Sequence, residues 1–387
     1  MLSQTLLAMR AAGRPADMIC GQLRRLWTTP AAAVDLLWQR YRRDPRRRRH
    51  ARWIAAACAG KMPAVSLQDV LDTRADLHGV PAVVAGLSVA GTRRVATRGT
   101  VRATSDSCFR IASLTKTFTS AALVLALREQ GVPLSTPAVE LLPHLAPDWR
   151  ADASLTVEQI LGQVSGLRES VDATAVAGLG GDHAVDEAAR LVVRAGNDRE
   201  PGARWSYYNG NYFLAGALLA ALDGARYETA LKKTLLEPWN LDRTGFDAPG
   251  DPITGWDGPT ELPAADYPRS RRPSGGLWSC VSDLLTLGEG LLGDKALLEE
   301  VRRPRTRPDD PMTYGLGWAL GPSGQMYLNG RLPGYRAAML LVPDTDHVSV
   351  VLTNQQHALP AAAGILSELQ RPLTGDDLAT AIDRFAA

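Results

Sequence analysis

The sequence predicts an α/β (α+β) fold, in which helices flank one antiparallel sheet built from both ends of the chain. Short β-branched segments occur near residues 83–97 and again after residue 314, whereas residues 132–250 are mostly helical in pattern. Composition agrees with a globular protein, because 45% of the 387 residues are hydrophobic and 22% are charged. These values exclude a largely disordered or coiled-coil chain.

Two parts are expected. Residues 1–62 form a basic helical extension with 13 Lys+Arg against 3 Asp+Glu, a net charge of +10 in a chain whose total is only +2. Residues 63–387 form the main domain. Its α/β lobe takes about 63–110 and 265–387, and about 111–264 form an inserted all-helical lobe.

In the extension, Thr29 as N-cap and Pro30 after it predict a helix start. The basic run Arg40–Arg52 is typical of a nucleic-acid arm, but a solvated helix face explains it equally well, so nucleic acid is the less favoured partner. Assembly into an oligomer through these helices is an open alternative. Leu2–Met9 lacks the features of a secretory signal, so we expect a cytoplasmic location. No apolar run is long enough for a membrane span.

The elements of the main domain follow from local patterns. Two β-branched runs joined by Gly91-Thr92 predict a hairpin, and an apolar helical stripe stopped by Gly131 predicts the clearest helix. Gly, Pro or Asp residues bound each later strand. In chain order, we expect a helix over Ser66–Leu77, strands over Val83–Val89 and Arg94–Thr97, helices over Ile111–Gln130 and Trp278–Leu292, strands over Tyr314–Leu320, Gln325–Asn329, Ala337–Val342 and His347–Asn354, and a helix over Ala361–Gln370.

Neither a metal nor another cofactor is expected. The four cysteines are scattered without CxxC spacing, and the six histidines form no HxH or HExxH cluster. Buried, reduced thiols are the expectation for the cysteines.

Ser113-Leu114-Thr115-Lys116 lies in the first turn of the clearest predicted helix. Residues three apart in a helix share a face, so these Ser and Lys side chains lie within reach of each other. A serine hydroxyl needs a neighbouring base to become a nucleophile. A lysine in a low-dielectric pocket has a lowered pKa and is able to serve as that base. An ordinary surface helix explains the pair equally well when it is taken alone.

Two later segments supply further candidates. The first segment contains Tyr207 and Asn209. A tyrosine near an ammonium group is pulled toward phenolate, so Tyr207 is a candidate base. Asn209 is expected to hold the lysine and a substrate carbonyl through its amide. Simple aromatic packing is the alternative for this segment. In the second, Gly330 lets a substrate approach the backbone, and the N–H of Arg331 points at a developing oxyanion.

Together these segments resemble the serine β-lactamase/penicillin-binding-protein superfamily, in its class C-like branch of esterases, D-aminopeptidases and transacylases. The resemblance covers about residues 63–370 and implies a β-lactamase/transpeptidase-like fold. It makes Ser113 the nucleophile, Lys116 its partner and Tyr207 the general base. It also implies that Asn209 positions groups and that the N–H groups of Ser113 and Arg331 form the oxyanion hole. Five ordered motifs carry it: Cys108–Lys116, Gln159–Leu167, Trp205–Tyr212, Ser274–Leu277 and Tyr314–Trp318.

Two positions depart from the family pattern. Leu328-Asn329-Gly330 stands where the family has K-T-G or H-x-G, and Gln163 replaces its usual histidine. Without that cation and hydroxyl, a substrate carboxylate lacks its partner, which is costly in an apolar pocket. Arg331 is the one substitute anchor that the segment offers. The change at Gln163 is expected to be structural.

We therefore expect an acyl-transfer enzyme with a covalent Ser113 intermediate, whose small-molecule acyl donor lacks that carboxylate. The acceptor is either water, as in an esterase or amidase, or an amine, as in the ATP-independent transacylases that the family supplies to antibiotic pathways. A weak β-lactamase or D-aminopeptidase, or a non-catalytic binding protein on the same fold, are the alternatives.

Overall fold

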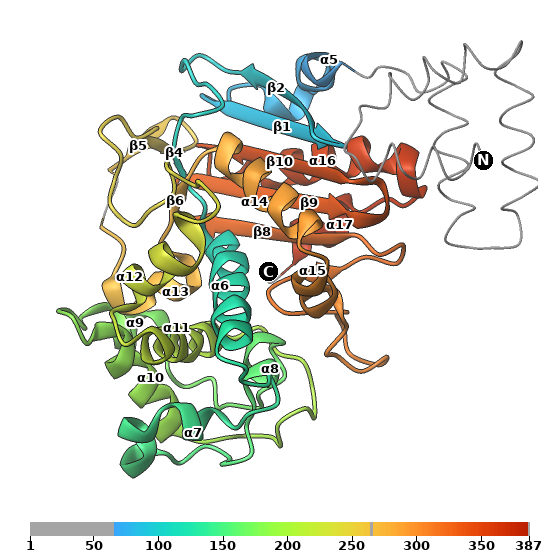
Figure 1. The fold of residues 1–387 in the computed structure, drawn as a ribbon. Coiled ribbons are helices and arrows are strands. Elements are labelled where there is room, and N and C mark those ends of the chain that lie inside the picture. Colours follow the sequence, from blue (N-terminus) through green and yellow to red (C-terminus); the bar gives the residue numbers. More distant parts are fainter. Residues whose placement is uncertain (1–65, 264–265, 386–387) are drawn as a thin grey trace, which may run out of the picture.

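The computed structural model describes residues 66–263 and 266–385 (Figure 1). The predicted helical extension of residues 1–62, with its helix start at Thr29-Pro30, lies outside the described residues. None of the described helices is long and apolar enough to cross a membrane.

A six-stranded antiparallel sheet forms the centre of the main domain, in the order β2-β1-β10-β9-β8-β7. It joins both ends of the domain, because β1 pairs with β10 from Val83 opposite Thr353 to Val89 opposite His347. The α/β fold class predicted from the sequence is therefore confirmed. The strands are β1 (Val83–Val89), β2 (Thr92–Arg98), β7 (Ala319–Leu320), β8 (Met326–Leu332), β9 (Tyr335–Val342) and β10 (His347–Thr353).

Helices cover both faces of this sheet, with α14 in front and α16 behind in Figure 1. Helix α14 (Val281–Gly293) approaches closely because glycines stand at the contact: a Cβ at Gly288 would lie 2.5 Å from Val348. The other helices of this lobe are α5 (Leu67–Asp72), α15 (Lys295–Arg302), α16 (Leu359–Thr374) and α17 (Ala379–Arg384), with short turns η1 (Ala75–Leu77) and η6 (Pro343–Thr345).

Between β2 and α14 the chain forms the helical lobe around α6 and α11 (Figure 1). Both helices are buried along most of their length, since each packs against neighbours on several sides. The helices are α6 (Thr115–Glu129), α7 (Ala138–Leu141), α8 (Val157–Leu161), α9 (Ala173–Ala177), α10 (Ala184–Ala195), α11 (Asn209–Asp223), α12 (Tyr227–Leu231) and α13 (Arg272–Gly275), with turns η2 (Ala112–Leu114), η3 (Pro143–Asp148), η4 (Lys232–Leu236) and η5 (Arg269–Arg271).

The lobe expected to be all-helical also contains a hairpin of β4 (Gly255–Asp257) and β5 (Thr260–Leu262). The Trp256 N–H bonds to the carbonyl of Asn354 at 2.8 Å, so the chain already returns to the sheet here. Local propensity did not reveal this hairpin because it is short and is held by the sheet lobe rather than by its own turn.

Two predicted elements need correction, and one helix was missed. Trp278–Ser279 is strand β6, paired with β3 (Phe109–Arg110), and helix α14 begins only at Val281. In the predicted strand over 314–320, only Ala319–Leu320 is a strand. Helix α17 was not predicted.

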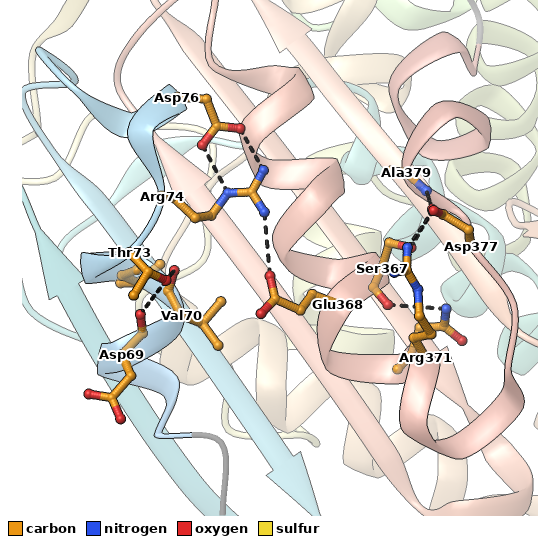
Figure 2. A network of polar contacts seen from close by, with 12 residues as sticks. Asp69, Val70, Thr73, Arg74, Asp76, Ser367, Glu368, Arg371, Asp377 and Ala379 are labelled. Carbon is orange, nitrogen blue, oxygen red and sulfur yellow. Dashed lines mark hydrogen bonds and ion pairs between the residues drawn. The ribbon is translucent and has the colours of Figure 1, made fainter. Parts of the chain in front are cut away.

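A polar network ties the outer helices together (Figure 2). Arg74, after α5, forms ion pairs with Asp76 and with Glu368 of α16, the second at 3.5 Å. At the turn into α17, the Asp377 carboxylate accepts hydrogen bonds from Ser367 at 2.9 Å and from the Ala379 N–H at 3.1 Å. These contacts fix the direction in which α17 leaves α16.

Candidate active site

Ser113 lies in the turn η2 between β3 and α6, one turn before the helix that the sequence predicted to contain it. The preceding residue, Ala112, has a φ of 47°. That left-handed conformation costs a non-glycine residue about 1–3 kcal/mol and is common where a reactive side chain is displayed. Ser113 itself is half-buried.

Lys116 is completely buried, and its Nζ lies 3.1 Å from the Ser113 Oγ. Nζ also donates to the carbonyl oxygen of Ser274 at 2.8 Å. Burial lowers the pKa of the lysine well below its usual value, and the positive charge of Arg271 lowers it further. A neutral amine with a free electron pair is therefore favoured beside the serine hydroxyl.

Tyr207 approaches the same serine from the other side, with its hydroxyl donating to Ser113 Oγ at 2.8 Å. Burial raises the pKa of Tyr207, and the hydrogen bond to Ser113 opposes this only in part. The expected pull toward phenolate is thus not observed, because burial that disfavours the charge of a lysine also disfavours that of a phenolate. The Lys116 Nζ lies 4.9 Å from the centre of the Tyr207 ring.

The motif Ser274–Leu277 holds the nucleophile turn from below. The Ile111 N–H donates to the carbonyl of Leu277 at 3.1 Å, and the Leu277 N–H donates to the Thr115 hydroxyl at 3.2 Å. Gly275 must be small, because a Cβ there would lie 2.6 Å from the hydroxyl of Tyr267. This motif therefore fixes Ser113 and also supplies the carbonyl that binds Lys116.

Gln163 supports the segment that carries Tyr207. Its side-chain oxygen accepts from the Tyr208 N–H at 3.1 Å and from the Asn211 amide, and its carbonyl accepts from the Ser206 N–H at 2.9 Å. Because it contacts no group at Ser113, its role is structural, in line with the sequence interpretation.

Strand β8 passes directly beside the nucleophile turn. A Cβ at Gly330 would lie 2.1 Å from the carbonyl of Ile111, so no other residue fits here without a shift. This close approach brings β8 against the turn that carries Ser113. An oxyanion hole made by the N–H groups of Ser113 and Arg331 stays a prediction.

The side chains of Asn329 and Arg331, two other predicted site residues, bond to the end of the chain rather than to Ser113. Leu328 is fully buried in β8, and the Asn329 amide donates to the carbonyls of Ile382 and Phe385. The Arg331 guanidinium donates to the carbonyls of Asp383 and Phe385. Alternation along a strand explains this, since Asn329 and Arg331 face away from Gly330.

Asn209 begins helix α11 and is exposed. The lysine it was expected to hold bonds instead to Ser113 and Ser274.

Comparison with known proteins identifies the family. The Beta-lactamase family matches residues 67–369. This chain belongs to the Beta-lactamase family. A relative is PbpX of Bacillus subtilis (strain 168), which carries the name of a penicillin-binding protein. It is 22% identical over 245 residues, a match that covers 61% of this chain and 60% of PbpX. The chain thus spans less than two thirds of that relative's length.

Solved structures share the β-lactamase fold. A D-stereospecific amidohydrolase from Streptomyces sp. superposes with a TM-score of 0.59 at 24% identity, covering 75% of this chain and 93% of that one. An octameric penicillin-binding protein homologue from Pyrococcus abyssi has a TM-score of 0.68 at 22% identity, covering 81% and 78%. At these identities the likeness establishes the fold.

Two further residues near the site were missed by sequence reasoning. Arg271 lies with its guanidinium 5.0 Å from the ring centre of Tyr267, and its charge acts on Lys116. Phe385 packs against Tyr207, with ring centres 5.4 Å apart. Both lie far from Ser113 in the chain and carry no motif, so only the fold reveals them.

The described residues offer no group of three or more His, Cys, Asp or Glu side chains able to hold a metal ion. Cys108 and Cys280 are buried free thiols. Cys20 and Cys58 lie outside the described residues.

Proposed function

We propose that the protein is a serine acyl-transfer enzyme that forms a covalent Ser113 intermediate with an ester or amide. One observation carries this proposal: a buried lysine of lowered pKa and a tyrosine hydroxyl both reach the same serine oxygen, at 3.1 and 2.8 Å. A surface serine and lysine on an ordinary helix would have neither the burial nor the second partner. Its structural neighbours include a D-stereospecific amidohydrolase and a class C β-lactamase, which agrees with such chemistry.

In the proposed reaction, Ser113 Oγ attacks the carbonyl carbon of the donor while its proton passes to neutral Lys116. The N–H groups of Ser113 and Arg331 bind the oxyanion. When the bond to the leaving group breaks, that group takes a proton from the Tyr207 hydroxyl, and the Lys116 ammonium returns one to the tyrosine. Tyr207 therefore acts as a neutral proton relay and Lys116 as the base.

The donor is proposed to lack a carboxylate next to the scissile bond. Leu328 offers no charge, and the guanidinium of Arg331 is already bonded to two main-chain carbonyls. A carboxylate placed there would leave an unpaired charge. β-Lactams and peptides ending in a free carboxylate are accordingly poor substrates, with a weak β-lactamase or D-aminopeptidase as the alternative.

We also propose a cytoplasmic location for the enzyme.

The acyl acceptor is proposed to be water or an amine. Adding a primary amine to a reacting ester distinguishes the acceptors. An amide product identifies a transacylase, and unchanged formation of the free acid identifies a hydrolase.

Intact-mass analysis after incubation with activated aryl esters tests the proposal. Wild type is expected to gain one acyl mass on the Ser113 peptide, and Ser113→Ala none. The matched control is Ser282→Ala. Ser282 lies on α14 and its hydroxyl bonds to Asp106, so this variant should be labelled like wild type. Equal labelling of Ser113→Ala would overturn the assignment of the nucleophile. Absence of any adduct in wild type would favour a non-catalytic binding protein.

A further inference from the structure

The segment Leu378–Phe385, called here the α17 segment, reaches the active site around the edge of β8. Helix α17 lies against β8 (Figure 1), and β7 pairs only with Met326 and Tyr327 of that strand. Among the described strands, none covers the rest of this edge, Leu328–Leu332. The α17 segment lies against this part of β8, where the side chains of Asn329 and Arg331 bond to it.

Side chains of β8 hold the α17 segment by its main chain. Asn329 and Arg331 together donate to the carbonyls of Ile382, Asp383 and Phe385. These bonds are independent of the side chains of the segment. At its other end the segment is fixed by Ser367, whose hydroxyl accepts from the Leu378 N–H at 2.8 Å and donates to Asp377 (Figure 2). Both ends of the segment are therefore anchored.

These anchors place the Phe385 ring beside the catalytic tyrosine. Phe385 is 0% exposed, meets the Tyr207 ring edge-on at 5.4 Å between centres and stacks on Tyr314 at 5.9 Å. Trp205 closes the cluster at 6.3 Å. Tyr207 in turn bonds to Ser113, so Phe385 is one side chain removed from the nucleophile. Fully buried, the Phe385 ring occupies the space next to the Tyr207 ring.

We propose that Phe385 is a specificity-determining residue: it closes the Tyr207 side of the site and restricts the enzyme to acyl donors that are short on that side. This inference rests on the proposed acyl-transfer function. A longer alkyl chain would have to displace a fully buried aromatic ring and the hydrogen-bonded main chain that holds it. Short acyl groups meet no such obstacle. The substrate class is therefore small esters or amides with a compact acyl group.

The test compares nitrophenyl acetate, butyrate and octanoate as acyl donors, measured as kcat/KM and as the initial release of nitrophenol. Wild type is expected to prefer acetate and butyrate over octanoate. Phe385→Ala should raise the octanoate-to-acetate ratio at least tenfold, because methylene groups in an apolar pocket each contribute about a factor of ten or more. Phe385→Leu should give a smaller rise, and it covers the case in which the alanine variant does not fold.

Ile382→Ala is the matched control. Ile382 is equally buried in α17, so this variant loses comparable packing without removing the ring beside Tyr207. Its ratio should equal that of wild type. If Phe385→Ala and Phe385→Leu leave the ratio unchanged, or lower all three rates by the same factor, Phe385 only supports Tyr207 and the inference is wrong. If wild type reacts with none of the esters, the proposed function fails and the inference fails with it.

Discussion

The two sides of the active site are built in different ways. On one side, Ser113 and Lys116 come from one short segment, and their chemistry depends on strain at Ala112 and on burial. On the other side, β8 binds the α17 segment, which lies more than two hundred residues further along the chain. We propose that the first side determines how a proton moves and that the second determines which donor fits. The two properties should therefore respond to different mutations.

The largest effects are expected on the proton-handling side. Lys116→Ala and Tyr207→Phe should each lower turnover of an aryl ester by roughly two or more orders of magnitude, because each removes a partner of the Ser113 oxygen. The double variant should be little worse than the single ones, since residues that act as a unit lose most function at the first deletion. Steady-state kinetics on all three variants checks this.

Circular dichroism and thermal unfolding of each variant establish that its fold is intact. If Tyr207→Phe kept near-full activity, Tyr207 would be a packing residue and Lys116 the only base. Tyr207 would then belong with the side of the site that selects the donor, because this residue also contacts Phe385.

The next largest effect concerns a carboxylate on the substrate. Wild type should hydrolyse a cephalosporin more slowly than a neutral aryl ester, because a charge-assisted hydrogen bond worth about 1.5–3 kcal/mol, or roughly ten- to hundredfold in affinity, is missing. Leu328→Lys should reduce the difference between the cephalosporin rate and the ester rate, with Leu328→Met as the neutral control. The ratio of the two rates on one sample is the readout, since a lysine at this fully buried position also lowers stability.

A cephalosporin rate above the ester rate in wild type would contradict the role given to Leu328. Arg331 would be a poor explanation of that result, as its guanidinium binds the α17 segment. Arg271, on the far side of Lys116, would then be the cation to replace, and a selective loss of lactam hydrolysis in Arg271→Gln would identify it as the anchor.

The difference between the two sides also explains what the sequence could predict. Short-range patterns with physical causes mark two segments: the nucleophile segment has a serine and a lysine three residues apart, and β8 has a glycine where a Cβ would collide with the backbone. Gly330, 2.1 Å from a carbonyl if it had a Cβ, is such a case. The sheet built from both chain ends followed from strand and helix periodicity: β1 and β2, and β7 to β10, pair with their neighbours in sequence, and the β1–β10 pair joins the two ends.

The rest depends on long-range contacts that no local pattern encodes. Phe385 is one aromatic residue in an unremarkable segment, and only the path of α17 brings it to Tyr207. The pKa direction of Tyr207 differs from the sequence expectation for a related reason: the sequence suggests a charged neighbour, whereas burial lowers the pKa of that lysine and raises that of the tyrosine. Burial at a site assembled from four separate segments is a property of the whole fold.

The smallest expected effect lies on the proton-handling side and concerns pH. Neutral Lys116 is the proposed base, so kcat/KM for a neutral ester should fall as the pH drops through the lysine pKa, which burial places well below its usual value. Arg271→Gln removes a positive charge that lowers this pKa further. The lysine pKa should rise, the acidic limb should move to higher pH, and the plateau above it should stay unchanged. The shift should be smaller than the one caused by burial, which is the larger of the two effects.

Arg269→Gln is the matched control for this pH profile, since it removes the same charge from the same turn, η5. Arg269 is paired with Glu228 at 2.8 Å and does not act on Lys116, so its profile should overlay that of wild type. An alkaline limb in place of the acidic one, moving to higher pH in Arg271→Gln, would mean that protonated Lys116 is the active form. Lys116 would then stabilise charge rather than accept a proton, and Tyr207 would have to act as the base despite its raised pKa.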